Sequence, residues 1–126
     1  MLVDVSIGEL IDKYTILLIK KSKIKNEEKL EKVNTEMNIL NNHVNTIKNK
    51  YNINELFTKL VEINTKLWEI EDNIRIKEKN KEFDNIFIEL ARSVYFTNDE
   101  RAYIKNEINK KTNSSIFEVK SYEKYS

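Results

Sequence analysis

The chain contains no cysteine and no proline, and its single glycine is Gly8. The absence of cysteine excludes disulfides, thiolate metal sites and cysteine nucleophiles. The absence of proline and the near absence of glycine remove the usual punctuation of turns and sheets. The formal net charge is only +1, from 22 basic and 21 acidic side chains, so no overall field draws the whole molecule onto nucleic acid or an anionic membrane. Any anion site must therefore be local.

Long apolar runs are missing as well. The longest aliphatic run, residues 16–19, is too short to cross a bilayer, and residues 1–5 lack the basic and apolar regions of a secretory signal. We therefore expect a soluble, cytoplasmic protein with no membrane partner. With 126 residues, the chain is predicted to form one domain over residues 1–126, because a second domain would have no room.

Apolar residues recur at helical spacing almost throughout the chain, which predicts an all-helical domain. Ser6 and Glu9 have the spacing of a capping box, so the first helix should begin there and run to about Ile24. Its apolar residues cover most of its circumference. That pattern is typical of a helix packed on several sides, so we expect it to be the central core helix.

Two heptad seams follow the first helix. The first lies between about residues 27 and 50, and the second runs from Leu56 to Ile74. Apolar residues spaced alternately by three and four are typical of coiled-coil seams. Because only a short polar break at residues 48–52 separates them, they predict a long antiparallel helical hairpin. The same seams could pair two chains, so a dimer stays open.

The last third of the chain predicts two shorter helices and a tail. The charged stretch 77–82 should connect to a fourth helix from about Phe83 to Phe96. Thr97 and Glu100 repeat the capping-box spacing, which predicts a fifth helix to about residue 111. Residues 112–126 alternate more like a short extended segment, which would either lie across the bundle or form a mobile tail. The predicted architecture is a bundle of about five helices.

The three arginines are clustered, whereas the 19 lysines are spread from Lys13 to Lys124. Guanidinium is a flat fork that grips carboxylate or phosphate with two bonds, so arginine is expected where lysine would not serve. We therefore predict that Arg75, Arg92 and Arg101 bind an anionic small molecule, such as a nucleotide or a phosphorylated sugar.

Polar side chains gather on one side of the third predicted helix, where Trp68, Glu71, Asp72 and Arg75 are three and four residues apart. Glu69 and Asp72 have the i, i+3 spacing of oxygen ligands, which makes Mg²⁺ or Mn²⁺ a candidate cofactor. Trp68 offers a flat surface for a base or sugar ring. Glu71 would orient an arginine. The alternative is a plain i, i+4 ion pair between Glu71 and Arg75.

A second polar group surrounds the predicted start of the fifth helix. Glu89 and Arg92 share one face of the fourth helix, while Tyr95, Asn98 and Arg101 lie around the corner that follows. Arginines beside a helix N-terminus would form an anion cradle, because free amides and the helix dipole favour negative charge there. Tyr95 is a second flat surface and Glu89 would orient an arginine. The alternative is that these arginines only pair with carboxylates of the third and fourth helices.

Five blocks of the sequence resemble an uncharacterised family of small bacterial all-helical domains. The blocks are SIGELIDK (6–13), LWEIEDNIR (67–75), ELARSVY (89–95), NDERA (98–102) and KSY (120–122). The resemblance implies a domain found beside or fused to glycosyltransferases, and hence a sugar-nucleotide or glycan context with a glycosyltransferase as a candidate partner. It transfers no catalytic residues.

Three functions therefore stay open. The leading one is a domain that binds, or acts on, an anionic small molecule in polysaccharide synthesis or glycosylation. The second is a non-enzymatic helical adaptor that binds a partner protein through the heptad seams. The third is a metal-dependent enzyme that resembles the all-helical nucleotide pyrophosphatases. Those enzymes bind metal through paired acidic helices, and Glu69-x-x-Asp72 is similar to one half of such a pair. Glu9 and Asp12 repeat the acidic spacing far upstream, but helix capping and pairing are their expected roles.

Overall fold

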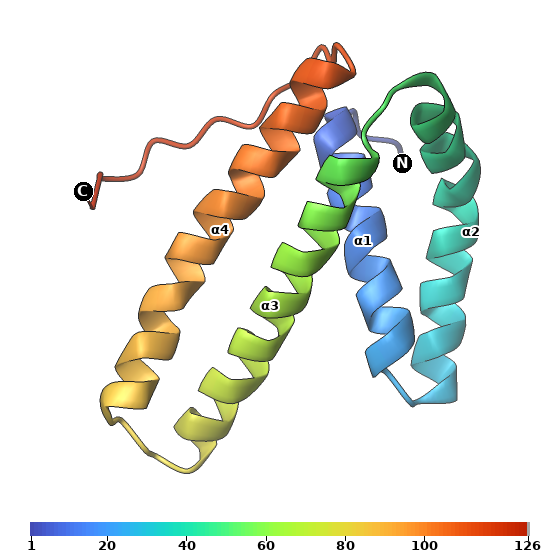
Figure 1. Cartoon of the computed structure of the whole chain (residues 1–126). Coiled ribbons are helices and arrows are strands. Elements are labelled where there is room, and N and C mark those ends of the chain that lie inside the picture. Colours follow the sequence, from blue (N-terminus) through green and yellow to red (C-terminus); the bar gives the residue numbers. More distant parts are fainter. Residues whose placement is uncertain (126) are drawn as a thin grey trace.

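The computed structural model describes residues 1–125, which contain four α-helices and no β-strand. The helices are α1 (Ile7–Lys23), α2 (Glu27–Lys50), α3 (Asn54–Lys79) and α4 (Asn85–Lys111). Figure 1 shows two antiparallel hairpins side by side, α1 with α2 and α3 with α4. The all-helical prediction is confirmed, but the described chain has four helices and not five.

Local capping signals set three of the helix starts. Ser6 caps α1, since its hydroxyl accepts a hydrogen bond from the backbone N–H of Glu9 at 3.0 Å. Asn26 caps α2 and Asp84 caps α4 in the same way. Each cap satisfies one of the first-turn amides that lack a partner within the helix. The predicted bounds of the first two helices are confirmed, whereas α4 begins at residue 85, two residues after the predicted Phe83.

The predicted break between a fourth and a fifth helix is wrong. Residues 97–100 lie inside α4, which runs without interruption for 27 residues. Thr97 is buried on the face that continues through Ile104 and Ile108, which are also buried. An N-cap must leave helical geometry, and that would interrupt this buried face. Tertiary packing therefore favours one long helix over the local capping pattern.

The predicted hairpin between the two heptad helices is also wrong. The extensive helix contacts are those of α3 with α4 and those of α1 with each of the other three helices, and α2 with α3 is not among them. The seam residues Val33, Met37 and Val44 of α2 are buried in clusters shared with Ile11 and Leu17 of α1. The seam of α2 packs against α1 and does not pair along α3. Because α1 contacts all three other helices, it is the central helix, as predicted.

The hydrophobic core lies around α1 and does not reach the far end of the α3–α4 hairpin. Its main cluster contains six buried residues, Ile11, Val44, Ile53, Leu60, Ile104 and Ile108. In contrast, none of the residues 71–96 is buried. This segment, the far half of the α3–α4 hairpin, extends beyond the end of α1 in Figure 1. No described helix is long and apolar enough to span a bilayer.

α1 and α4 approach closely at Gly8. Its backbone N–H donates to Oδ1 of Asn109 at 2.6 Å, and a Cβ at position 8 would lie only 2.3 Å from the carbonyl oxygen of Lys105. The single glycine of the chain is therefore required by the contact between these two helices.

Residues 112–125 have no regular secondary structure and fold back beside α4. The ring of Tyr125 packs on Tyr95 and Phe96, with centroids 5.3 and 4.8 Å apart. Nζ of Lys120 lies 3.9 Å from a carboxylate oxygen of Asp99. Within the described residues, the predicted tail therefore lies against the bundle.

Candidate functional site

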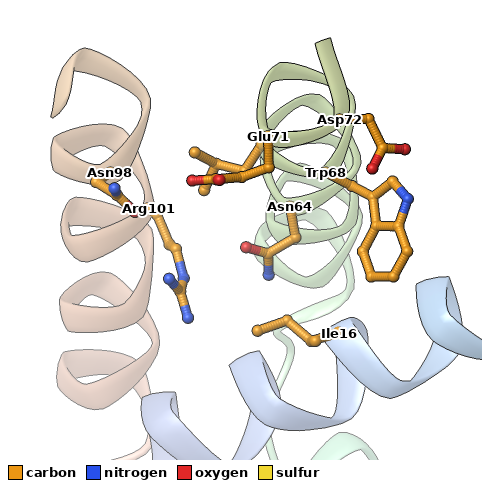
Figure 2. Close-up of a pocket in the computed structure, with 8 residues that line it drawn as sticks. Ile16, Asn64, Trp68, Glu71, Asp72, Asn98 and Arg101 are labelled. Carbon is orange, nitrogen blue, oxygen red and sulfur yellow. The ribbon is translucent and has the colours of Figure 1, made fainter. Parts of the chain in front are cut away.

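A pocket of about 430 Å³ lies where α1, α3 and α4 meet. Figure 2 shows Glu71 of α3 pointing toward α4, and Arg101 of α4 reaching toward α1, while Trp68 and Asp72 project from the other side of α3. The volume is typical of small-molecule sites, which combine apolar walls with a few polar groups. The lining residues are Ile16, Asn64, Leu67, Trp68, Glu71, Asp72, Asn98 and Arg101.

The guanidinium of Arg101 is held at the pocket by Asp12, a fully buried carboxylate of α1. Nε donates to Oδ1 at 2.9 Å and Nη2 donates to Oδ2 at 2.5 Å. This two-bond grip is one that lysine cannot reproduce. The hydrogen bonds to Asp12 raise the pKa of Arg101 above its ordinary value. Within residues 1–125, Nη1 makes no hydrogen bond, and Arg101 is one of the residues that line the pocket.

Asn64 is positioned by the same buried carboxylate. Its Nδ2 donates to Oδ1 of Asp12 at 2.9 Å and to Oγ1 of Thr15 at 2.8 Å. Figure 2 shows the amide nitrogen pointing to α1 and the amide oxygen turned toward α4. Asp12 therefore fixes a hydrogen-bond donor, Arg101, beside a hydrogen-bond acceptor, the oxygen of Asn64.

A second buried cation, Lys105, lies one turn further along α4. Its Nζ is 2.6 Å from a carboxylate oxygen of Glu9, 3.0 Å from one of Glu118 and 4.0 Å from Oδ2 of Asp12. Burial alone would lower the pKa of Lys105, but its ion pairs with Glu9 and Glu118 raise it above 10.5. A lysine that stays charged is a poor nucleophile. Lys105 therefore joins α1, α4 and the tail, and does not fit a covalent catalytic role.

The three arginines are not brought together. Arg75 is exposed, and its Nη2 lies 3.2 Å from a carboxylate oxygen of Glu71, which is the plain i, i+4 pair. Arg92 is exposed, with its guanidinium carbon 5.9 Å from the ring centroid of Phe96. Only Arg101 lines the pocket. The helix start on which the predicted anion cradle depended does not exist, because α4 is continuous there.

Of the other predicted ligand residues, some line the pocket and some lie outside it. Trp68 and Asn98 line the pocket, whereas Tyr95 lies outside it and packs on Tyr125. Glu89 is exposed and makes no ion pair within residues 1–125, so it does not orient Arg92. Binding by the residues in the pocket stays a prediction.

The predicted cation ligands are only partly placed at the pocket. Asp72 lines it together with Glu71, but Glu69 is exposed and does not. Across residues 1–125, no group of three or more histidine or carboxylate side chains is arranged to hold a metal ion. Figure 2 shows Glu71 and Asp72 on different sides of α3, so a cation bound by either carboxylate would need its other oxygen ligands from a bound molecule. Binding of Mg²⁺ or Mn²⁺ together with a ligand that supplies oxygen atoms stays a prediction.

Two residues that position the pocket, Asp12 and Asn64, were not among the predicted ligand residues, and for Asp12 only helix capping and pairing were expected. Asp12 follows Ile11 on the face of α1 that also carries Gly8 and Thr15, all of them buried. A carboxylate on a buried face needs a buried cation. Asn64 likewise lies beside the apolar seam, four residues after Leu60 and three before Leu67, where a polar residue often has a specific partner. The sequence alone does not identify the partners of these residues, since Asp12 and Arg101 are 89 residues apart.

Comparison with known proteins gives a match over nearly the whole chain. The matching family model is described as a family of unknown function (DUF6165), and it covers residues 1–125. No curated protein and no solved structure matches the chain. The predicted resemblance to an uncharacterised family is confirmed, but the match names neither a ligand nor a partner.

Proposed function

Because the chain belongs to DUF6165, a family of unknown function, we propose a function from its own pocket: the domain binds an anionic, sugar-containing small molecule between α1, α3 and α4. Nucleotides and phosphorylated sugars are the ligand classes, and polysaccharide synthesis or glycosylation is the setting. One observation carries the proposal. The fully buried Asp12 holds the guanidinium of Arg101 and the amide of Asn64 side by side at the pocket.

The lining suits a hydroxylated ring. A sugar hydroxyl both donates and accepts hydrogen bonds, so it is best bound by fixed donors and acceptors in alternation. Arg101 supplies donors, Glu71 and the oxygen of Asn64 supply acceptors, and Asn98 supplies both. The indole of Trp68 adds a flat apolar surface against which a ring can pack.

The charge of the pocket limits how anionic the ligand can be. Arg101 is offset by Asp12, and Glu71 and Asp72 add two negative charges to the lining. The proposal therefore assigns one anionic group to the remaining N–H donors of Arg101. A ligand with more phosphate charge would need a divalent cation between its phosphate oxygens and Asp72. Mg²⁺ or Mn²⁺ dependence is expected for nucleoside diphosphates and not for neutral sugars.

The other two functions have less support. An adaptor that binds through its heptad seams would need them exposed, but Val33, Met37 and Leu60 are buried within the chain. A pyrophosphatase-like metal site would need Glu9 free on its helix, whereas its carboxylate lies 2.6 Å from Nζ of Lys105.

The pocket contains the chain's only tryptophan, so ligand binding can be followed directly by intrinsic fluorescence. The titration panel contains nucleotides, sugar phosphates, sugar nucleotides and neutral sugars, each with and without Mg²⁺ or Mn²⁺. We expect a saturable change in the emission of Trp68 for at least one anionic sugar-containing compound. The same compound at 100 times its dissociation constant should stabilise the fold by about 2.7 kcal/mol. A flat response in both assays across the panel would contradict the proposal.

Two arginine substitutions give a matched comparison. Arg101→Lys keeps the charge but loses the fork, so it should weaken ligand binding. Arg92→Lys makes the same change outside the pocket and should leave binding unchanged. Because Arg101 also holds Asp12, Asn98→Ala is the second pocket variant, with Asn45→Ala on the exposed face of α2 as its control. Equal binding by all four variants would show that the ligand lies elsewhere.

A further inference from the structure

The far half of the α3–α4 hairpin is apolar but not covered. It contains 26 residues, of which 11 are apolar, and none of them is buried. Four large side chains stand out, because each is between 51 % and 57 % exposed: Ile76, Phe83, Ile86 and Ile88. Large apolar side chains that stay exposed together on one segment are typical of an interaction site.

The start of α4 shows why one neighbouring helix cannot cover this surface. Ile86, Phe87 and Ile88 are consecutive, so at 100° per residue they point to different sides of the helix. Phe87 is half-buried, and its ring packs edge-on against Phe83, with centroids 5.2 Å apart. Ile86 and Ile88 flank it and remain exposed. A helix that is apolar on several sides requires more than one neighbour.

We propose that the far half of the hairpin, residues 71–96, docks against the same segment of a second copy of this chain. Two helices from each copy would form a four-helix bundle around a two-fold axis, with each copy burying the apolar surface of the other. The proposal does not rest on ligand binding in the pocket, and the two sites share only Glu71 and Asp72 at the start of the segment.

The charges of the segment favour a second copy over a strongly charged partner. Residues 71–96 carry six acidic and five basic side chains of interspersed sign, so the surface is nearly neutral and can face itself. Lys77 at the tip is already paired, with its Nζ 3.0 Å from Glu82 and 2.8 Å from Asp84. An anionic membrane would instead require an excess of unpaired basic residues.

The exposed apolar area is of the order that a stable interface needs. Four large side chains that are about half exposed present roughly 300 Å² of apolar surface per copy, at about 150 Å² for each side chain, which is the lower end of the range for aromatic residues. A standard interface buries about 800 Å² per partner, of which somewhat more than half is apolar. Because Ile86 and Ile88 lie on different sides of α4, the far half of the hairpin approaches this apolar share only if the two helices of the partner contact α4 on both of these sides.

Light scattering after size exclusion, over a range of protein concentrations, tests the proposal on the full chain. The mass should rise to that of a dimer. Ile86→Glu should weaken the dimer at least tenfold, because it places a carboxylate in the apolar contact. Ile39→Glu is the matched control, since Ile39 is 67 % exposed on α2 and should leave the dimer unchanged. Ile88→Glu replaces Ile86→Glu if circular dichroism shows that the latter has lost helix content.

Three results would overturn the inference. The chain could stay monomeric at every concentration, or Ile39→Glu could weaken the dimer as much as Ile86→Glu does. The third is a monomer that binds vesicles of phosphatidylglycerol and loses this binding in Ile86→Glu, which would assign the surface to a membrane.

Discussion

The ion pair between the buried Asp12 and the half-buried Arg101 allows a quantitative prediction for the substitution Asp12→Asn. Asparagine has the same shape but no charge, and it presents only one acceptor where aspartate presents two. One of the donors that now reach Asp12, from Arg101 or Asn64, would therefore meet an N–H group. The guanidinium of Arg101 would also lose its counter-ion, with Lys105 as a second cation nearby.

The magnitude follows from the burial of the carboxylate. Removing one partner of a buried ion pair costs about 3 to 5 kcal/mol, because the other charge is left uncompensated. That is a large share of the roughly 5 to 15 kcal/mol by which small domains are stable. For a chain of this length, each kcal/mol lowers Tm by about 3 to 5 °C, so Asp12→Asn should lower Tm by roughly 10 to 25 °C. Thermal and urea unfolding, followed by circular dichroism, measure both quantities.

Two further variants separate this explanation from a general effect of losing a carboxylate. Glu71→Gln breaks the exposed pair with Arg75 and should cost only about 0.3 to 0.5 kcal/mol. Asp12→Leu combined with Arg101→Met removes both charges and should recover most of the stability lost in Asp12→Asn. The reasoning is refuted if Asp12→Asn costs less than about 1 kcal/mol, as expected of a solvent-exposed pair.

Other positions give three further predictions. Gly8→Ala should cost about 1 to 3 kcal/mol in urea unfolding, because its Cβ would meet the carbonyl oxygen of Lys105; an unchanged midpoint would mean that α1 and α4 separate easily. Asp84→Ala removes the cap of α4 and should cost about 1 kcal/mol, whereas Asp84→Asn, which can still cap, should recover part of it. The raised pKa of Lys105 means that its contribution to stability is complete below pH 10.5 and is lost as the pH rises through the raised value. The difference in unfolding free energy between wild type and Lys105→Met should therefore shrink above pH 10.5, and a constant difference would contradict this linkage.

The helices that were predicted correctly are those whose signals are local. Ser6 caps the first helix, and the apolar spacing carries the next two helices to within a few residues of their ends. The predicted helix start at Thr97 was wrong, because the local capping pattern does not report the buried face of α4 that continues through Thr97. The positions Val94, Thr97, Arg101 and Ile104 are spaced by three and four residues, so the continuity of α4 was readable in the sequence.

The site was predicted less well, because the arrangement of its side chains depends on contacts between residues that are far apart in the sequence. Trp68, Asp72 and Arg101, which the sequence marks by their chemistry at helical spacing, line the pocket, and their binding roles stay predictions. The convergence of the arginines was wrong. Which sides of α3 and α4 face each other depends on packing against α1, and no local pattern reports that packing. The pairing of Arg101 with Asp12 is visible only when the first and last helices are placed together.

The distance along the chain between Asp12 and Arg101 also has a consequence for synthesis on the ribosome. When α1, α2 and α3 have emerged, the core-facing side of α1 carries a carboxylate whose cations, Arg101 and Lys105, have not yet been made. Burial of that carboxylate without a partner is too costly to persist. We therefore expect the nascent chain to remain loosely packed until α4 is released, and to complete its tertiary structure in a late, concerted step.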